Sequence, residues 1–274
     1  MFVCVAGKND ISVNVLQWLI EHKGSRYELG IVCNQNETGK DSWQRSLRAY
    51  ARSAGVKEYR LEEVYDIPEQ VFLSLEFDQI VKPEKWVDAR MYNVHFSLLP
   101  KYRGMYTSAL PILFGEKESG VTLHKIDRGI DTGAIIAQRV VAIAEEDICR
   151  DLYLKYIKSG TEMMLEYIEV LLEGTETAVP QERQEATYFS KDAVNYANLR
   201  IDLRKTAEQV RNQIRAFCFP EYQYPRVFGR EIAKAIVTDN RSVLPPGHLV
   251  VETEKDMLVS TNDYDVRMYY PTVN

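Results

Sequence analysis

Cysteine is scarce in this sequence, and long apolar runs are absent from it. The 274 residues include four cysteines, Cys4, Cys33, Cys149 and Cys218, which form no CxxC pair and lie at no metal-ligand spacing from a histidine. We therefore expect reduced thiols, and neither a disulfide framework nor a metal site. No segment approaches the roughly 18 uninterrupted apolar residues of a membrane-spanning helix, and no basic stretch precedes the first apolar run. These features predict a cytoplasmic protein that has no membrane partner.

A surplus of basic residues is also missing. The sequence has 34 lysines and arginines against 40 aspartates and glutamates, for a formal net charge of -6. This balance produces no general positive field, so nucleic acid is not expected as a partner, and a phosphate-bearing ligand must meet a local cluster of cations. With 45% hydrophobic and 27% charged residues the chain is typical of a folded protein, which excludes the disordered and collagen-like classes.

Short apolar runs alternate with helical patterns over the first two thirds of the chain. Strands are predicted at residues 2–6, 29–33, 77–81, 92–96, 121–126 and 133–143. Helices are predicted over residues 42–54, 108–114 and 148–172, and one more is expected early in the chain with Asp10 as its N-cap. The alternation predicts an α/β fold, with a Rossmann-like, doubly wound and mainly parallel sheet.

A smaller second unit is predicted to follow this sheet. The two are joined by a polar, glutamate-rich stretch that contains Pro180, as expected of a connection. We predict an N-terminal domain over residues 1–178 and a smaller C-terminal α+β domain over residues 179–274. In the C-terminal domain Thr206 is expected to cap a helix, and short β-like pieces follow Arg230.

Two polar side chains stand out on the fourth predicted strand. Asn93 and His95 lie two residues apart, so they project from one face of a strand near its C-terminal end, where open α/β sheets place their sites. An imidazole moves protons near neutral pH, and an amide donates to an oxygen that becomes negative, which together suit acyl transfer to an amine. Asp131, in a loop between Gly129 and Gly133, is a candidate carboxylate to orient the imidazole.

Each of these residues also has a structural interpretation. A histidine on an apolar strand is more often a hydrogen-bonded core residue, and an aspartate between glycines usually serves a turn. Spacing alone therefore leaves the catalytic and the structural interpretation both open.

The surrounding segment carries a longer series of motifs. Asn93-x-His95 is followed by Ser-Leu-Leu-Pro at residues 97–100, by Tyr102 and Gly104, by Gly-Val-Thr at residues 120–122 and by Asp-Thr-Gly at residues 131–133. In this order the motifs resemble the folate-dependent formyltransferase family. The resemblance extends over most of residues 75–220.

This resemblance implies an enzyme, an N-formyltransferase that uses 10-formyltetrahydrofolate as co-substrate and needs no metal. It implies that Asn93 and protonated His95 stabilise the oxyanion formed when a primary amine attacks the formyl carbon, while Asp131 orients His95 and assists proton removal. It also implies folate contacts, made mainly by backbone groups, at Leu75, Glu76, Phe77, Asp78, Asp127 and Gly129.

The acceptor expected from the resemblance is a nucleotide sugar. Residues 74–86 and 95–108 are most similar to bacterial N-formyltransferases that act on dTDP-linked amino-dideoxy sugars of O-antigen or capsule. dTDP-4-amino-4,6-dideoxyglucose is favoured, ahead of a dTDP-3-amino-3,6-dideoxy sugar. Residues 151–274 hold 15 basic and 19 acidic side chains, which argues against the tRNA acceptor of other family members.

The substrate contacts predicted from the resemblance are Lys101, Tyr102, Arg103, Tyr106, Thr107, Arg215 and Tyr222. Lys101 and Arg103 offer cations to a pyrophosphate, and Tyr222 offers a ring that stacks on a thymine. The same residues also fit a solvated loop and a packed aromatic hinge. Two other functions stay open: a formyltetrahydrofolate hydrolase or a formyltransferase with another acceptor, and a nucleotide-binding scaffold without activity. A homodimer is expected, because the apolar tail after Arg230 offers strands for pairing.

Overall fold

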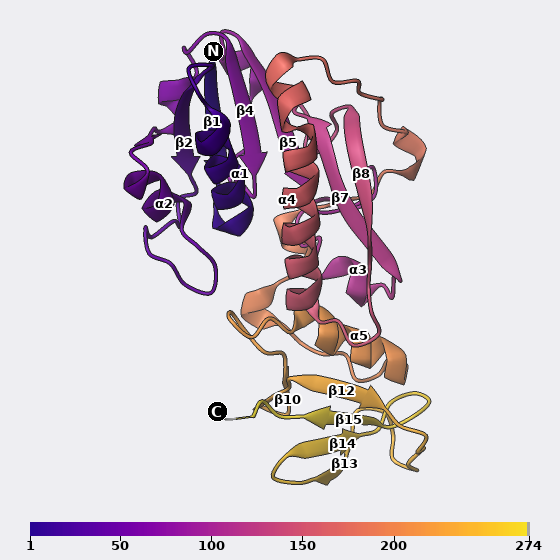
Figure 1. Ribbon diagram of the computed structural model, residues 1–274. Coiled ribbons are helices and arrows are strands. Elements are labelled where there is room, and N and C mark those ends of the chain that lie inside the picture. Colours follow the sequence, from indigo (N-terminus) through magenta and orange to yellow (C-terminus); the bar gives the residue numbers. More distant parts are fainter. Residues whose placement is uncertain (273–274) are drawn as a thin grey trace. The chain divides into compact units, whose positions relative to one another are not determined.

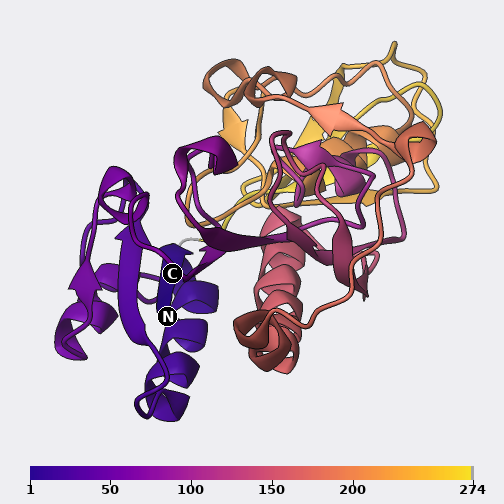
Figure 2. The same cartoon turned by 90° about the horizontal axis from the view of Figure 1, so that it is seen from above.

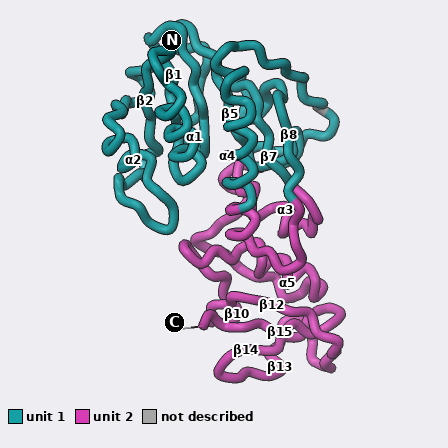
Figure 3. Tube along the Cα trace, in the orientation of Figure 1, with its two compact units in different colours: residues 1–104, 120–141, 155–188 teal, residues 105–119, 142–154, 189–274 magenta. Residues whose placement is uncertain are grey.

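The computed structural model describes residues 1–272 and divides the chain into two compact units (Figure 3). Unit 1 is drawn from residues 1–104, 120–141 and 155–188, and unit 2 from residues 105–119, 142–154 and 189–274. The two units are therefore interleaved along the chain. The domain boundary predicted between residues 178 and 179 falls near the end of the last stretch of unit 1, and it stays a prediction.

Unit 1 is built on a seven-stranded sheet of order β3-β2-β1-β4-β5-β7-β8 (Figure 1). Its strands are β1 Phe2–Gly7, β2 Glu28–Cys33, β3 Lys57–Glu58, β4 Gln70–Leu75, β5 Ala89–His95, β7 Glu118–Lys125 and β8 Ile135–Ala142. The five strands from β3 to β5 pair in parallel, and β7 runs antiparallel to β5. The predicted Rossmann-like, mainly parallel α/β sheet is confirmed.

Two long helices, α1 and α4, cover one face of this sheet (Figures 1 and 2). The helices that belong mainly to unit 1 are α1 Asn9–His22, α2 Leu47–Ser53 and α4 Cys149–Glu173, with short 3₁₀ turns at Leu61–Val64, Pro83–Lys85 and Arg183–Glu185. At Gly160, α4 packs closely against β5 and α1. A Cβ there would lie 3.1 Å from Val94 and 3.2 Å from Ile11, so the glycine allows the helix to reach both β5 and α1.

The opposite face of the sheet carries its own apolar cluster. Its buried members are Phe2, Cys4, Ala6, Val32, Leu61, Val64, Phe72, Trp86 and Met91. Alternate residues of β1 contribute to it because successive side chains of a strand point to opposite faces. Phe77 and Ile126, from the loops after β4 and β7, both pack against this cluster, so it supports the two loops from beneath.

Three expectations for unit 1 are wrong in detail. The strand expected at residues 77–81 lies earlier, at β4, because Glu76 takes a left-handed conformation (φ 59°) that ends the strand. Asp10 lies in the first turn of α1, whose N-cap is Lys8, and its carboxylate pairs with Arg45. The helix expected from residue 42 begins only at Leu47, since Ser46 caps it by accepting a hydrogen bond from the backbone of Ala49.

Unit 2 combines a short helical part with an antiparallel sheet of order β12-β15-β14-β13. Its elements are α3 Leu110–Leu113, α5 Ala207–Phe217, β10 Arg226–Val227, β11 Arg230–Glu231, β12 Lys234–Val237, β13 Leu249–Glu252, β14 Asp256–Val259 and β15 Val266–Tyr269, with 3₁₀ turns at Lys191–Ala193 and Tyr196–Asn198. A further short pair joins β6 Arg103–Gly104 to β9 Tyr188–Phe189. The expected cap at Thr206 is confirmed: its hydroxyl accepts from the backbone N–H of Gln209.

The core of unit 2 lies between α5 and its sheet. The buried residues are Ala207, Val210, Ile214, Val227, Ile232, Ala235, Met257, Val259, Val266 and Met268. The α5 members recur at the three- and four-residue spacing of one helix face, and the sheet members come from alternating positions. The smaller C-terminal α+β unit expected from the sequence therefore has a core of its own.

Candidate active site

Three polar side chains lie side by side on the central strands of unit 1. Asn93 of β5 is paired in register with Ser74 of β4 and with His124 of β7. Residues paired across a sheet project to the same face, so the register brings these three side chains together. His95 lies two residues beyond Asn93 on the same face of β5 and is 8% exposed.

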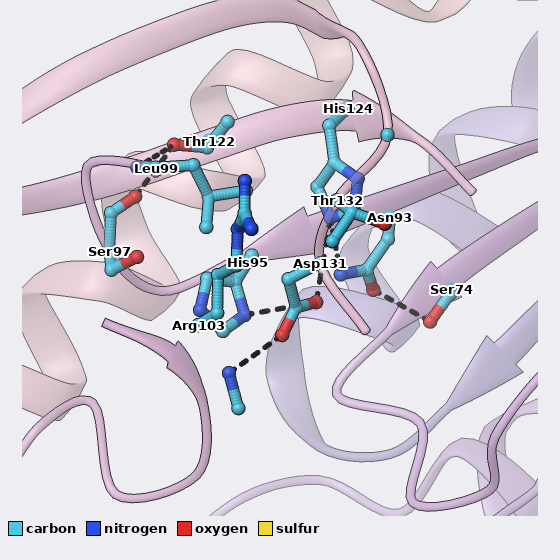
Figure 4. Close-up of polar contacts among 12 residues, drawn as sticks. Ser74, Asn93, His95, Ser97, Leu99, Arg103, Thr122, His124, Asp131 and Thr132 are labelled. Atoms are coloured by element: carbon cyan, nitrogen blue, oxygen red, sulfur yellow. Dashed lines mark hydrogen bonds and ion pairs between the residues drawn. The ribbon is translucent and has the colours of Figure 1, made fainter. Parts of the chain in front are cut away.

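Asn93 is held from both sides (Figure 4). The Ser74 hydroxyl donates to Asn93 Oδ1 at 2.7 Å, and Asn93 Nδ2 lies 3.0 Å from His124 Nε2. An amide NH₂ has two hydrogens, and this contact uses one of them. The second hydrogen has no protein partner within residues 1–272, so the arrangement leaves one amide donor available to a ligand.

His95 faces an oxygen atom at each ring nitrogen. Its Nε2 lies 2.8 Å from the carbonyl oxygen of Tyr102, and its Nδ1 lies 3.5 Å from Asp131 Oδ1. Burial lowers the pKa of His95, and the Asp131 carboxylate and the Tyr102 carbonyl oppose that shift without cancelling it. The ring is therefore neutral near pH 7, and the Asp131 carboxylate beside Nδ1 is placed to stabilise a proton that the ring takes up.

Asp131 is an ionised carboxylate in a tight loop. Its Oδ2 accepts from the backbone N–H of Gly104 at 2.9 Å, and its Oδ1 lies 3.7 Å from His124 Nε2. Burial alone would raise the pKa of Asp131, but His95, His124 and the Gly104 N–H together outweigh it and hold the pKa at about 2. The charge therefore persists across the physiological range.

A glutamine and a threonine brace the loops that carry these groups. Gln181 donates through Nε2 to the carbonyl oxygens of Asp131 and Gly133, at 2.9 and 2.7 Å. The Thr187 hydroxyl accepts from the backbone N–H of Tyr102 at 2.7 Å. The geometry of Asp131 and of the Tyr102 carbonyl is thus set by the segment that follows α4.

Sequence reasoning missed His124, Ser74 and Gln181. His124 and Thr122 are polar residues two apart that alternate with the apolar Val121 and Leu123, which is the same signal that singled out Asn93 and His95. Ser74 could be recognised only once the register of β4 against β5 was known. Gln181 carried no signal, since it lies in a polar connection.

The residues expected to contact folate lie on the loops after β4 and β7. Leu75 is fully buried, and its carbonyl oxygen already accepts from the Ser12 hydroxyl at 2.9 Å. Asp127 closes its own turn, accepting from Gly129 N at 3.0 Å and from the Thr132 hydroxyl at 2.5 Å. A Cβ at Gly129 would lie 2.1 Å from the Thr132 hydroxyl, so this turn requires glycine.

The remaining members of this set are more open. Glu76 accepts from the Asn9 side chain at 3.2 Å, and Asp78 is exposed and accepts from the backbone N–H of Gln35 at 3.3 Å. Phe77 is half-buried over the apolar cluster beneath it. Backbone groups and the Phe77 ring are therefore the parts of this loop that a ligand can reach.

Three of the residues expected at the substrate lie in unit 1, in the loop after His95. Lys101 is exposed. Tyr102 takes a left-handed conformation (φ 59°), which turns its carbonyl toward His95. Arg103 donates to Gln181 Oε1 through Nε at 3.1 Å and through Nη2 at 2.6 Å. Arg103 and Asp131 are therefore connected through one glutamine.

The other four expected substrate residues belong to unit 2. The Tyr106 hydroxyl donates to the carbonyl of Lys191, and Thr107 follows it half-buried. Tyr222 is 63% exposed and lies against the Phe219 ring. Arg215 is buried and donates to the carbonyl oxygens of Asp147 and Ala144 and to Asn212 Oδ1. The roles of all four at a substrate stay predictions.

Within residues 1–272, no group of three or more histidine, cysteine, aspartate or glutamate side chains is arranged to hold a metal ion. No helix in that part of the chain combines the length and apolarity required to cross a membrane.

Comparison with known proteins places this cluster in a family. A family model described as formyl transferase matches residues 75–168. WlaRD, a sugar 3N-formyl transferase solved in the presence of dTDP and 5-N-formyl-THF, is 38% identical with a TM-score of 0.91, and the match covers 100% of this chain and 99% of that one. This chain belongs to the formyltransferase family.

Two further relatives bear on this formyltransferase. The N-formyltransferase from Helicobacter canadensis, solved in complex with folinic acid and dTDP-3-aminofucose, is 39% identical with a TM-score of 0.90, over 98% of this chain and 99% of that one. Methionyl-tRNA formyltransferase from Enterococcus faecalis is 37% identical over 57% of this chain. The match spans only 50% of the length of that curated relative. The family resemblance drawn from the motifs is confirmed.

Proposed function

We propose that this formyltransferase transfers the formyl group of 10-formyltetrahydrofolate to the amine of a dTDP-linked amino-dideoxy sugar. The observation that carries the proposal is the cluster of Asn93, His95 and Asp131, which combines a spare amide donor, a proton carrier and a persistent carboxylate. The folate and dTDP ligands named for the two similar structures support the choice of substrates.

The loops after β4 and β7 fit a folate. Phe77 and Ile126 pack on one apolar cluster, so the two loops lie next to each other, and Ile130 is 40% exposed. A pterin is flat and carries several donors and acceptors, which suits apolar side chains together with backbone groups of exposed loops. We assign Glu76, Phe77, Asp78 and Gly129 to hold it. When bound, the folate supplies an activated one-carbon unit.

The cluster performs the transfer in three linked roles. The free N–H of Asn93 donates to the formyl oxygen as that oxygen becomes negative. Asp131 takes the proton released when the amine nitrogen bonds to the formyl carbon. His95, which is neutral at rest, receives this proton from Asp131 at Nδ1 and donates it to the nitrogen whose bond to the formyl carbon breaks. The bond formed, the bond broken and the transferred proton balance without a metal or an oxidant.

The proposal has two versions, which differ in the sugar carbon that carries the acceptor amine. The sequence favours a 4-amino sugar, whereas the two sugar-formyltransferase structures described above are named with 3-amino chemistry or a 3-amino sugar. We therefore place dTDP-3-amino-3,6-dideoxy sugars ahead of dTDP-4-amino-4,6-dideoxyglucose. The acidic balance of residues 151–274 continues to argue against a tRNA acceptor.

The test is direct assay of both amine positions. The protein is incubated with 10-formyltetrahydrofolate and with matched dTDP-3-amino and dTDP-4-amino sugars, and products are analysed by mass spectrometry. We expect a gain of one CO on the 3-amino sugar and release of tetrahydrofolate. Formate release without an acceptor would instead identify a hydrolase, and absence of both products would overturn the proposal.

Two wider predictions complete the proposed role. The product is expected to enter O-antigen or capsule synthesis, because formamido-dideoxy sugars carried on dTDP are activated for glycosyl transfer. The protein is expected to form a homodimer, which gel filtration with light scattering measures.

A further inference from the structure

Asn93 is held between Ser74 and His124, and the chemistry of His124 favours one orientation of the amide. Across β4, β5 and β7 the order is Ser74, Asn93 and His124, and all three side chains lie on one face (Figure 4). Asn93 Oδ1 accepts from the Ser74 hydroxyl at 2.7 Å, and Asn93 Nδ2 lies 3.0 Å from His124 Nε2. The direction of the second contact depends on which nitrogen of His124 carries the hydrogen.

The backbone settles that question. His124 Nδ1 lies 2.8 Å from the carbonyl oxygen of Lys125, and a carbonyl only accepts, so Nδ1 carries the hydrogen. In the neutral ring Nε2 then has only a lone pair, which accepts from Asn93 Nδ2. His124 is therefore an acceptor facing the amide nitrogen, and it would repel the amide oxygen if Asn93 turned over.

A glycine supports this arrangement from the neighbouring loop. A Cβ at Gly133 would lie 1.7 Å from the Lys125 carbonyl oxygen and 3.4 Å from His124 Nδ1. The absence of a side chain at Gly133 leaves room for the carbonyl that fixes the His124 tautomer. The Asp-Thr-Gly motif thus supplies the carboxylate at Asp131 and the space required at its third position.

We propose that Ser74 and His124 are positioning residues, which hold the Asn93 amide in one orientation and present its second N–H to the formyl oxygen. The inference rests on the proposed function. Turning the amide over would place Oδ1 against an oxygen that becomes negative, so orientation decides whether Asn93 stabilises or repels the transition state. Ser74 acts only through Asn93, and His124, whose Nε2 also lies 3.7 Å from Asp131 Oδ1, touches no reacting atom.

The first test separates acceptance of a hydrogen bond from bulk. His124→Leu removes the acceptor, whereas His124→Gln places an amide oxygen near the former Nε2. We expect kcat to fall ~10- to 100-fold in His124→Leu, with each KM within ~3-fold, because a misdirected group costs rate more than binding. His124→Gln should recover most of kcat. A His124→Leu enzyme within 2-fold of wild-type kcat would overturn the inference.

The second test asks whether His124 acts through Asn93. In an Asn93→Ala background, adding His124→Leu should change the residual rate less than ~2-fold, since residues acting through one group are not additive. Loss of rate as large as in the wild-type background would overturn the inference and assign His124 an independent role. An active Asn93→Ala enzyme would instead overturn the proposed function, so the two failures are distinguishable.

The third test adds readouts that do not depend on activity. In ¹⁵N-histidine spectra of the folded protein, His124 should show Nδ1 protonated and Nε2 bare, and the opposite tautomer would contradict the proposal. Ser74→Ala should lower kcat by a smaller factor, and Ser74→Thr should restore it by keeping the hydroxyl. The matched control is Ser260→Ala in unit 2, a serine only 1% exposed whose hydroxyl contacts backbone carbonyls. It should lower thermal stability and leave kcat unchanged.

Discussion

Each unit buries a group of polar side chains, and the two groups differ in how their hydrogen-bond donors are used. In unit 1, Asn93 and His95 have partners on most of their polar atoms, but one N–H of Asn93 stays open. In unit 2, Arg215 is buried with its Nε, Nη1 and Nη2 all donating, two of them to backbone carbonyls of the loop before α4. One group keeps a donor beside an imidazole and a carboxylate. The other directs at least one donor from every nitrogen of Arg215 to its own chain, and in that sense we call it the saturated group.

This difference separates function from support. A buried donor with a partner stabilises the fold, whereas an open donor in a shaped site costs stability and is retained where it binds something. Arg211, one turn before Arg215, follows the saturated pattern, since it pairs with Glu146 and Glu208 and donates to the carbonyl of Glu145. Burial and the neighbouring Arg211 lower the pKa of Arg215. These arginines therefore fasten a loop to α5.

The largest effect is expected from disrupting the polar group of unit 1, in which Asn93 keeps an open donor. Asn93→Ala removes the spare N–H, and loss of an oxyanion donor lowers kcat ~10²- to 10³-fold. Thermal stability should fall by a smaller margin, because the buried Ser74 hydroxyl and His124 Nε2 lose their common partner. Steady-state kinetics with the 3-amino sugar measure the effect, and Asn93→Asp, which keeps the shape without the donor, should be equally impaired. Wild-type turnover in either variant would remove Asn93 from the mechanism.

The next largest effect is expected from disrupting the polar group of unit 2, which centres on Arg215. Arg215→Met leaves the carbonyls of Ala144 and Asp147 without their donor, and unpaired buried groups of this kind cost about 3 kcal/mol in total. Urea unfolding measures this loss. The KM for the dTDP sugar should stay near the wild-type value if Arg215 only supports the loop. A KM that rises steeply while stability is unchanged would restore Arg215 to the substrate site predicted from the sequence.

The sequence predicted which segments form the sheet better than it predicted where each strand ends. The runs that became β1 and β2 are apolar, and those of β5 and β7 alternate apolar with polar residues, so their pattern is enough to find them. β4 was missed because its strand Gln70–Leu75 ends at a left-handed glutamate, a conformation that glycine usually marks. The apolar Phe77 beyond it belongs to a loop packed on the core. The hydrophobic pattern of a sequence indicates which residues are buried, but it does not indicate where an extended strand ends.

The sequence singled out three residues of the candidate site, but it did not predict the hydrogen-bond partners that hold them. Asn93, His95 and Asp131 were found from spacing and motif, and the structure brings His95 within 3.5 Å of Asp131. His124 comes from a strand separated by about thirty residues, so its place beside Asn93 depends on strand register, which the sequence does not encode locally. The partners of Arg215 could not be foreseen for the same reason, since only the fold shows where its nitrogens donate, and its role at a substrate stays a prediction.

A smaller effect tests the charge of the open group. The pKa of Asp131 is held at about 2, below the ~3.9 of an unfolded aspartate, so its ionised form stabilises the protein above pH 4. That contribution, about 2 kcal/mol, is lost as the pH falls from 4 toward 2. Asp131→Asn should therefore be less stable than wild type at pH 7, with the gap closing in acid. Chemical denaturation between pH 7 and 2 measures it, and a constant gap would contradict the charge assignment.

The smallest expected effect concerns unit 2 alone. It tests whether a change in this unit lowers stability without lowering kcat. Thr206 caps α5, accepting from Gln209 N at 3.3 Å, while Gln209 Oε1 accepts from Thr206 N at 3.2 Å. Thr206→Ala removes the first bond and should cost about 1 kcal/mol, as loss of such a cap usually does. Thr206→Ser keeps the hydroxyl and should restore it in urea titrations. Both variants should turn over at the wild-type rate, because a cap supports the core of unit 2 and offers no donor to a ligand. A large fall in kcat from Thr206→Ala would show that the saturated groups also shape the reaction.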